Sequence, residues 1–432
     1  MNEVVLNTGD TAWVLASSAL VLLMTPGLAL FYGGMVRAKS ALNMMMMSLI
    51  SIGIVSVLWV IYGFKMAFGY EADSPWIGSF SLSGLGDVVN ELANNGGIYP
   101  IPLLVFAVFQ LMFAIITPAL ISGAIADRAK FLSWGIFVAI WATVVYFPVA
   151  HWVFAFGNKV GDEVTGVGFL AGRGVQDFAG GTAVHINAGA AALALAIVLG
   201  RRIGWQRSPM RPHSLPLVLL GAALLWFGWF GFNAGSALGA NGLAGLAFIN
   251  TQVATAGALI GWIFVERLRD GHFTSLGAAS GVVAGLVAIT PACAFVAPWA
   301  AVVIGLIAGA LCSLAVGLKY RFGYDDSLDV VGVHLVGGII GSLAIGFFGS
   351  SAVNSLGLDG LFYGGGTALL AKQALGVGLV LAYSFVVTLI IGYLIEKTIG
   401  FRVTSDDEVA GVDLSEHAES AYEMGGILKG GR

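Results

Sequence analysis

Two histidines carry the chemistry that this sequence offers most clearly. His185 and His334 lie inside long apolar stretches, one in each half of the 432-residue chain. A buried polar group without a hydrogen-bond partner costs roughly 2–7 kcal/mol, and ionisable residues at bilayer depth mark paths through a protein. A neutral imidazole donates from one nitrogen and accepts at the other, so a pair can pass protons without becoming a fixed charge. The histidines predict a transport pore; a structural pair bonded to backbone carbonyls is the alternative.

The elements that must hold these histidines are membrane spans. The chain is 58% hydrophobic and 10% charged, with a mean hydropathy of +0.90, which is typical of an integral membrane protein. A helix needs about 20 apolar residues to cross a hydrocarbon core of about 30 Å. Eleven runs of suitable length are predicted, at about 11–36, 42–64, 100–125, 132–154, 178–199, 215–236, 246–265, 274–291, 296–317, 330–348 and 368–395.

Basic residues indicate the orientation of these spans. Alternate connections contain Arg37, Lys39, Arg128, Lys130, Arg201, Arg202, Arg207, Arg211, Arg267, Arg269, Lys319, Arg321, Lys397, Arg402, Lys429 and Arg432. The other side has only Lys65, Lys159, Arg173 and Lys372. The positive-inside rule therefore places the N-terminus outside and the C-terminus in the cytoplasm. The leader, residues 1–10, is acidic and has no basic residue, so we expect it to be transferred outward without cleavage.

The predicted fold class is all-α: a polytopic membrane protein of eleven transmembrane helices. Five spans form a unit that reverses direction when repeated, so two inverted repeats, about 11–199 and 215–348, are expected, with an eleventh helix at about 368–395. Residues 1–395 form the membrane domain, and 396–432 form a cytoplasmic tail. Each half has an Asp ahead of its His, Asp177 before His185 and Asp329 before His334, although the two spacings differ.

Other reactive patterns are scarce. Cys293 and Cys312 lack metal-ligand spacing and are expected to pack as small hydrophobes. The sequence has no HExxH, no GxSxG and no paired acids inside a span, so an enzyme is not predicted, and neither is a metal or a cofactor. A net charge of −4 does not suggest nucleic-acid binding. The partner that the composition predicts is the lipid bilayer.

Five stretches, in order along the chain, resemble the ammonium transporter (Amt/Mep/Rh) family, on its Amt branch. They are PGLALFYGG at 26–34, DFAGGTAVHIN at 177–187, GWFGFNAGS at 228–236, TPAC at 290–293 and DVVGVH at 329–334. The resemblance implies a homotrimer with one pore per subunit in the cell membrane, each pore being built from two inverted five-helix halves plus an outer helix. It implies ammonium or ammonia as substrate, with methylammonium as an analogue.

The resemblance also implies roles for individual residues. Ser236 would accept a hydrogen bond from the arriving cation in an outer vestibule, Phe113 and Phe232 would stack as a gate, and His185 and His334 would meet edge to edge below it. The positions expected to line the route are Phe31, Trp229, Thr290 and Ala179. Such a pore would select ammonium with aromatic faces and one hydroxyl, and then conduct ammonia after deprotonation.

Two outer positions need separate treatment. Asp177 is predicted to cap a helix N-terminus, and the resemblance adds a part in cation recruitment through its field; both interpretations stay open. In AHWVF at 150–154, Phe154 stands where many relatives carry Trp. Phenylalanine has the weaker cation–π face, so cation binding is expected to be weaker, and Trp152 is not expected to replace the missing indole.

The tail and the choice of function complete the sequence-based predictions. The acidic segments 400–408 and 413–422 resemble a family tail that packs on cytoplasmic loops, couples subunits and lies near the surface where a PII-type signalling protein docks. The leading hypothesis is an ammonium transporter. A sensor that reports ammonium to a separate partner is the alternative, although the tail is too short for a catalytic output module.

Overall fold

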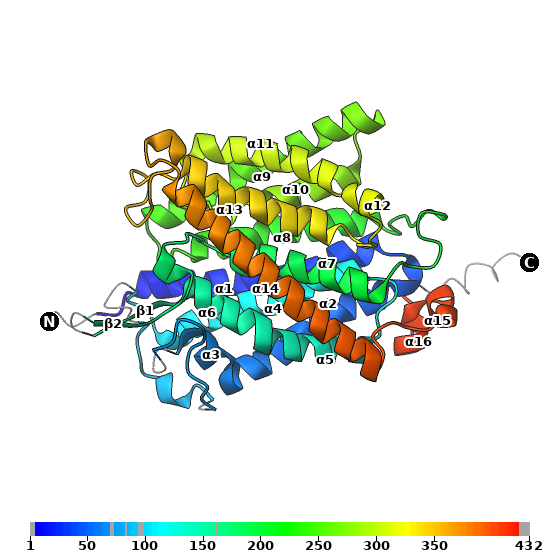
Figure 1. Cartoon of the computed structure of the whole chain (residues 1–432), viewed down its shortest axis with the longest axis horizontal. Coiled ribbons are helices and arrows are strands. Elements are labelled where there is room, and N and C mark those ends of the chain that lie inside the picture. Colours follow the sequence, from blue (N-terminus) through cyan, green and yellow to red (C-terminus); the bar gives the residue numbers. More distant parts are fainter. Residues whose placement is uncertain (1–4, 70–72, 83, 94–98, 161–162, 423–432) are drawn as a thin grey trace, which may run out of the picture.

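The computed structural model describes residues 5–69, 73–82, 84–93, 99–160 and 163–422 (Figure 1). Within these residues, ten helices are long and apolar enough to cross a membrane. The region 274–291, predicted as another span, forms the shorter helix α10, Ser275–Ile289, whose fifteen residues are mostly buried among its neighbours. The all-α, multi-pass membrane fold is thus confirmed, and the chain is a multi-pass protein of the cell membrane.

The long helices follow the predicted spans, and short elements connect them. The α-helices are α1 (Thr8–Met35), α2 (Ala41–Leu58), α3 (Phe64–Phe68), α4 (Leu103–Ile121), α5 (Phe131–Trp141), α6 (Phe147–Phe154), α7 (Asn187–Leu199), α8 (Leu215–Gly235), α9 (Gly242–Asp270), α10 (Ser275–Ile289), α11 (Pro298–Ala315), α12 (Leu318–Phe322), α13 (Val336–Phe348), α14 (Ala368–Thr398), α15 (Ser405–Ala410) and α16 (Val412–His417). The 3₁₀ segments are η1 (Ala38–Ser40), η3 (Gly86–Val88), η4 (Ser122–Ile125), η6 (Ala171–Arg173) and η9 (Leu361–Tyr363). The π-helical segments are η2 (Trp59–Gly63), η5 (Ala142–Tyr146), η7 (Gly181–Ile186) and η8 (Val331–Leu335). The strands β1 (Phe156–Val160) and β2 (Glu163–Val167) pair antiparallel.

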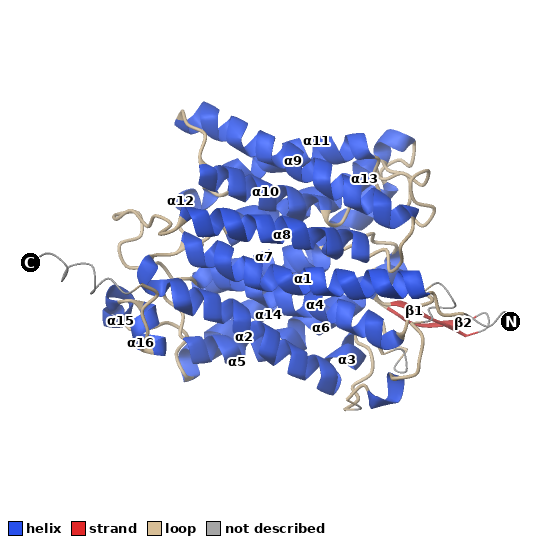
Figure 2. Ribbon diagram, turned by 180° about the vertical axis from the view of Figure 1, so that it is seen from behind, coloured by secondary structure: helices blue, strands red, loops and turns tan. Residues whose placement is uncertain are grey.

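Helices that begin the two predicted halves lie against each other. Helix α1 packs along α8, and the helices run side by side along the long axis of the molecule (Figures 1 and 2). A Cβ atom on Gly221 of α8 would lie 2.3 Å from the backbone nitrogen of Phe31, so only glycine permits this approach. At the contact of α9 with α11, a Cβ atom on Gly309 would lie 2.0 Å from the carbonyl oxygen of Ala258. Small residues thus set the spacing of these helix pairs.

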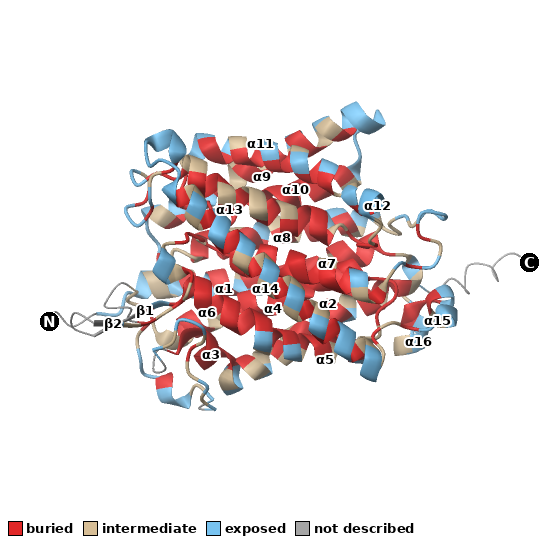
Figure 3. Cartoon of the chain, in the orientation of Figure 1, coloured by how far each residue is buried: buried red, intermediate tan, exposed pale blue. Residues whose placement is uncertain are grey.

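Burial follows the pattern that a bilayer requires. The middle of the bundle is buried, whereas the outer faces of helices such as α9 and α14 are exposed (Figure 3). The exposed side chains are themselves apolar, for example Ile260 and Phe264 on α9 and Leu394 on α14. In water such faces would be costly, but lipid tails are as apolar as these side chains. The outside of the bundle is therefore suited to lipid and the inside to the pore residues.

Different small elements lie at the two ends of the bundle. The β1–β2 hairpin lies at the end where the chain begins, and α15 and α16 lie at the opposite end (Figure 2). The tail packs on the membrane domain of its own chain: Asp413 accepts hydrogen bonds from the backbone nitrogens of Leu42 and Asn43, and Glu416 accepts one from Phe131. These carboxylates cap the N-termini of α2 and α5. Residues 423–432, the last part of the predicted tail, lie outside the described residues.

Candidate functional site

His185 and His334 meet in the middle of the bundle. The Nδ1 atoms of the two rings are 3.3 Å apart, the ring centroids are 5.4 Å apart, and the ring planes differ by 25°. Both side chains are almost completely buried. The rings lie side by side and share one hydrogen bond through Nδ1, so one ring donates and the other accepts. Charging both rings would place two positive charges together in an apolar surrounding, so at most one ring of the pair is an imidazolium.

Each histidine stands on a π-helical turn. His185 belongs to η7, which continues into α7, and His334 belongs to η8, which continues into α13. A π turn widens the helix by one residue and is frequent at functional sites. Segment η7 packs against α13, and η8 packs against α7, so the two crossing helices bring the two rings to one point. The sequence predicted the helices but not these wide turns.

Aromatic side chains cover one side of the histidine pair. Trp229 stacks on His185 with centroids 5.3 Å apart and planes 19° apart. Its indole nitrogen donates to the hydroxyl of Thr290 at 2.8 Å, and that hydroxyl donates in turn to the carbonyl of Leu286. Thr290 therefore orients Trp229. Phe232 lies next to both rings, with its centroid 5.4 Å from Trp229 and 6.2 Å from His185.

Phe113 and Phe232 form a stacked pair farther toward the outer end. Their centroids are 4.1 Å apart with planes 29° apart, and Phe109 contacts Phe113 edge-on. Both rings of the pair are buried. Ser236 lies four residues beyond Phe232, at the end of α8, and its hydroxyl donates to the Phe232 carbonyl at 2.8 Å. The hydroxyl oxygen therefore keeps its acceptor capacity for a donor that arrives from outside.

Asp177 directs its carboxylate at the backbone that precedes His185. It accepts hydrogen bonds from the backbone nitrogens of Gly180, Gly181 and Thr182 at 2.7–2.8 Å, and from the Thr182 hydroxyl. Among the described residues no cation forms a salt bridge with it. The buried carboxylate is thus held by helix-terminal amides, and its charge acts on its surroundings through the field.

The remaining predicted positions are distributed along the same axis. Phe154 ends α6 and is buried, but within the described part of the chain no ring contact joins it to Phe113 or Phe232. Ala179 is buried in the turn after Asp177. Trp152 points elsewhere: its indole donates to the carbonyl of Trp76 and packs against Phe169, so it does not replace the indole that position 154 lacks.

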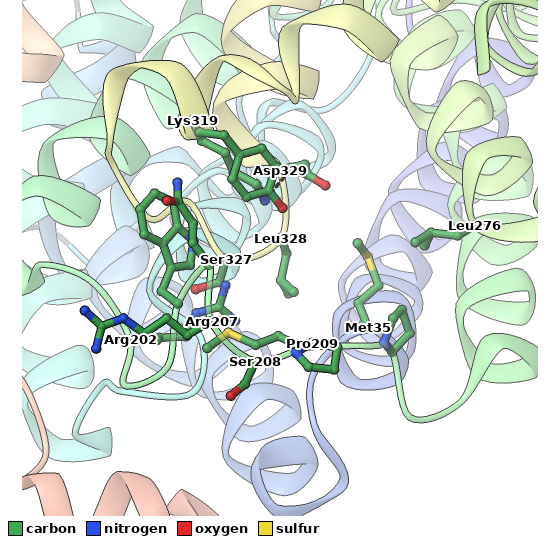
Figure 4. A pocket seen from close by; sticks show the side chains of 15 residues that line it. Met35, Arg202, Arg207, Ser208, Pro209, Leu276, Lys319, Ser327, Leu328 and Asp329 are labelled. Atoms are coloured by element: carbon green, nitrogen blue, oxygen red, sulfur yellow. Dashed lines mark hydrogen bonds and ion pairs between the residues drawn. The ribbon is translucent and has the colours of Figure 1, made fainter. Parts of the chain in front are cut away.

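Two neighbouring cavities lie on the basic side of the histidines. A small one of about 10 Å³ is lined by Phe31, Tyr32, Met35, Ser280, Val283, Leu328, Asp329, Val333 and His334. A larger one of about 440 Å³, which we call the inner vestibule, shares Met35, Leu328 and Asp329 with it and adds residues such as Arg202, Trp205 and Lys319 (Figure 4). The two cavities therefore lie next to each other, and these shared residues stand between His334 and the inner vestibule.

A second buried carboxylate, missed in the sequence, matches Asp177. Asp326 lies eight positions before His334, as Asp177 lies eight before His185. It accepts a hydrogen bond from Val331, the first residue of η8, at 2.7 Å. The weak symmetry noted with Asp329 was thus assigned to the wrong aspartate; the equal spacing of eight was the available signal. Burial and the nearby charge of Asp329 raise the pKa of Asp326 to about 6, although Lys319 opposes this.

A network of charged side chains joins the loops at the cytoplasmic end. Arg128 is fully buried and donates to the carbonyl of Asp325 at 2.6 Å and to the Ser327 hydroxyl at 2.6 Å. Arg202 donates to the carboxylates of Asp325 and Asp127. Burial lowers the pKa of Arg128 to about 10. Burial opposes ionisation of Asp325, but its bonds to Arg202 hold the pKa of Asp325 below its usual range.

Metal-binding chemistry is not evident in the part of the chain that the structure describes. No group of three His, Cys, Asp or Glu residues there is arranged to hold an ion. Cys293 and Cys312 are buried and unpaired, as small hydrophobic residues are. The site is therefore a largely apolar segment of the bundle that contains two imidazoles, with aromatic rings on one side and carboxylates at both ends.

Comparisons with known proteins agree over nearly the whole chain. The family model described as Ammonium Transporter Family matches residues 12–422. An ammonium transporter from Mycobacterium tuberculosis is 56% identical over 434 residues, which covers 96% of this chain and 90% of that protein. The crystal structure of Saccharomyces cerevisiae Mep2 is similar with a TM-score of 0.83, 33% identity and coverage of 93% and 91% of the two chains. A structure titled Sensor Amt Protein has a TM-score of 0.83, 31% identity and coverage of 95% and 98%.

Proposed function

The chain belongs to the ammonium transporter family, and from this premise we propose how its residues select and conduct the substrate. Members of the family are transporters and not enzymes. We propose that ammonium is recruited at the outer end, loses a proton at the stacked phenylalanines, and passes the histidine pair as ammonia.

Recruitment in this proposal uses the outer end of α8. The Ser236 hydroxyl oxygen accepts one N–H of the cation, and the face of Phe113 attracts its charge. Asp177 contributes through its field, because its oxygens are already held by backbone amides. Phe154 adds the weaker cation–π face that replaces an indole. Phe232 closes the path below, so the cation meets a ring stack of 4.1 Å spacing before it can advance.

Deprotonation follows from the dryness of the next segment. An ion that leaves water for an apolar passage loses several kcal/mol of solvation, whereas neutral ammonia loses far less. Among the described residues of the site directly beneath the gate, the imidazole pair provides the proton acceptors. Its shared proton lies on the Nδ1–Nδ1 hydrogen bond. We propose that the proton of ammonium transfers to this pair and leaves toward the cytoplasm. The 3.3 Å contact of His185 with His334 is the observation that carries the proposal.

The test compares the parent protein with His185→Ala and His334→Ala in proteoliposomes. Radiolabelled methylammonium uptake and membrane current are measured on the same preparations. Either substitution removes one partner of the shared hydrogen bond, so we expect current to fall by at least about tenfold, the loss of about one charge-assisted hydrogen bond. Ser313→Ala serves as a control, because Ser313 is a buried hydroxyl on α11 that forms no side-chain hydrogen bond with either ring. Selective current that survives in both histidine variants would remove the proton role.

One observation supports the sensor alternative. The structure titled Sensor Amt Protein is as similar as the Mep2 structure, with a TM-score of 0.83 for both. A parent protein that binds methylammonium in the same preparations but conducts neither label nor charge would favour the sensor. Transport by the parent would favour the leading proposal.

The proposed assembly follows the family resemblance. We propose a homotrimer in which every subunit has its own pore, with the inverted halves at about 11–199 and 215–348 and the eleventh helix outside them. The tail packs on its own membrane domain through Asp413 and Glu416, and in the proposed trimer it also contacts the neighbouring subunit. A PII-type signalling protein that docks on this cytoplasmic face and closes the inner vestibule completes the proposal.

A further inference from the structure

Asp329 has a left-handed backbone conformation, and the equivalent position in the other half is a glycine, Gly180. Asp329 lies five positions before His334 and has φ +64°, while Gly180 lies five positions before His185 and has φ +116°. L-residues avoid this left-handed region, although Asp tolerates it better than most. Strained positions of this kind cluster at functional sites. The second half therefore places a carboxylate where the fold itself requires only a turn.

Asp329 also lies at the junction of the two inner cavities. It lines the small cavity together with His334, and it lines the inner vestibule together with Lys319 (Figure 4). The small cavity measures about 10 Å³, which is close to the least space that holds one water molecule. A solute or proton that leaves His334 toward the cytoplasm thus reaches Asp329 within about one water molecule.

The carboxylate of Asp329 already binds an ammonium group, that of a side chain. The Nζ atom of Lys319 donates to Asp329 Oδ1 at 2.6 Å and to the carbonyl oxygen of Asp326 at 2.9 Å. Asp329 Oδ2 accepts no hydrogen bond from the described residues, and its side chain is 27% exposed. One carboxylate and one carbonyl oxygen at this point therefore fit an R–NH₃⁺ group, and a second carboxylate oxygen is free.

The charges around this point favour a cation. Asp326 is buried beside the Lys319–Asp329 pair, and its Oδ1 has no hydrogen-bond partner. Lys319 faces the carboxylates of Asp326 and Asp329, so the net charge of these three side chains is negative when both carboxylates are ionised. Arg202 and Arg207 also line the vestibule: Arg202 is occupied by Asp325 and Asp127, and no ion pair among the described residues joins Arg207 to this point.

We infer that Asp329, with Lys319 as its exchangeable counter-ion, forms an inner station that binds ammonium as it re-forms at the exit of the pore. The inference rests on the proposed function. The proton balance is closed: the proton that incoming ammonium leaves on the imidazole pair returns to the ammonia nitrogen beyond His334. The resulting ammonium donates an N–H to Asp329 and competes there with the Lys319 side chain, and no other reactant is needed.

The test measures how ammonium on the cytoplasmic side inhibits uptake. Right-side-out membrane vesicles are loaded with increasing ammonium, and radiolabelled methylammonium uptake from outside is followed. Asp329→Asn keeps the shape and tolerates the left-handed backbone but removes the charge, so the half-inhibiting lumenal concentration should rise by about tenfold or more, the effect of losing a charge-assisted hydrogen bond. Lys319→Met removes the competitor, so the same concentration should fall.

Opposite shifts are the decisive feature. Both substitutions break the same ion pair, and damage to the fold would move both variants in one direction. Asp270→Asn is the control, because it breaks an exposed ion pair with Arg269 at the same membrane side and outside the vestibule. Asp270→Asn should leave both the half-inhibiting lumenal concentration and the KM for external methylammonium unchanged.

The outcomes separate this inference from the proposed function. Suppose that the current of the Asp329 and Lys319 variants still depends on His185, but that the half-inhibiting lumenal concentration shifts equally in both variants or in neither. This result would overturn the inner station alone. Uptake that does not depend on His185 in any variant would overturn the proposed function, and the inner station with it.

Discussion

At the scale of single residues, two aspartates with equivalent positions differ in how well their charge is compensated. Asp177 accepts four backbone N–H bonds and a hydroxyl bond, whereas Asp326 accepts one backbone N–H bond, from Val331, and has an unpartnered Oδ1. Buried carboxylates with few donors hold their proton more tightly. Asp326, which has few donors in its buried position, can therefore titrate near neutral pH.

This difference predicts a pH-dependent stability that Asp326→Asn removes. The pKa of Asp326 is raised to about 6 from an ordinary 3.8, so the folded state binds this proton more tightly than the unfolded chain. The stabilisation by protonation is complete below the ordinary pKa and is lost as the pH rises through 6. Asn retains an oxygen for Val331 without the charge. We expect the variant to be more stable at pH 7.5, by at most about 3 kcal/mol.

Thermal unfolding in detergent between pH 4 and pH 8 measures this effect. The difference between variant and parent should shrink as the pH approaches 4, where the parent is protonated. Asp359→Asn, at an exposed outer loop, gives the matched control for removal of a carboxylate. A variant that is less stable than the parent by the same amount at every pH would contradict the prediction.

The sequence predicted those site residues whose chemistry is unusual for an apolar span or which belong to a recognisable family motif. His185 and His334 stand out because ionisable residues are rare in apolar spans, and their meeting was predicted. Asp326 was passed over because Asp329 belongs to the more recognisable motif, DVVGVH. That Thr290 holds the Trp229 indole depends on a contact between α8 and α10 that no local pattern encodes.

At the scale of elements, helix length was predictable and helix shape was not. Hydropathy follows from the bilayer thickness, which is why the spans fall where expected. The π turns at η7 and η8 depend on how α7 and α13 cross, and α10 ends after fifteen residues because its neighbours bury it, so it need not reach both surfaces itself. Tertiary packing decides such features.

The docked tail yields a prediction at this scale. Asp413 caps α2 by accepting from the nitrogens of Leu42 and Asn43 at 3.0 and 2.8 Å. Asp413→Ala should cost about 1 kcal/mol, as loss of a helix cap does, and it should release α16. Hydrogen exchange followed by mass spectrometry should then show faster exchange over residues 404–417, with the pore helices unchanged.

A neighbouring acidic residue provides the control for that experiment. Asp406→Ala removes an exposed carboxylate of α15 that makes no side-chain hydrogen bond with the described residues. Its exchange pattern should match the parent. If both variants exchange alike, the Asp413 contacts do not anchor the tail.

At the scale of the whole molecule, the bundle has a buried interior and an apolar exterior, and the mass of the complex tests the proposed assembly. Apolar side chains such as Ile260 and Phe264 are exposed along α9, which suits either lipid or another subunit. We predict that native mass spectrometry in mild detergent gives three times the 44.8 kDa mass of the chain. Dilution should not dissociate the complex, and a mass of one or two chains would contradict the trimer.

The buried Arg128 has a consequence for how the protein is made. Its guanidinium, which follows the span Leu103–Ile125, is completed by Asp325 and Ser327, which precede the span Val331–Phe348. These acceptors lie 197 and 199 residues later in the chain, so most of the membrane domain must be synthesised before the guanidinium can be satisfied. A chain that ends before them leaves this buried charge without two of its acceptors.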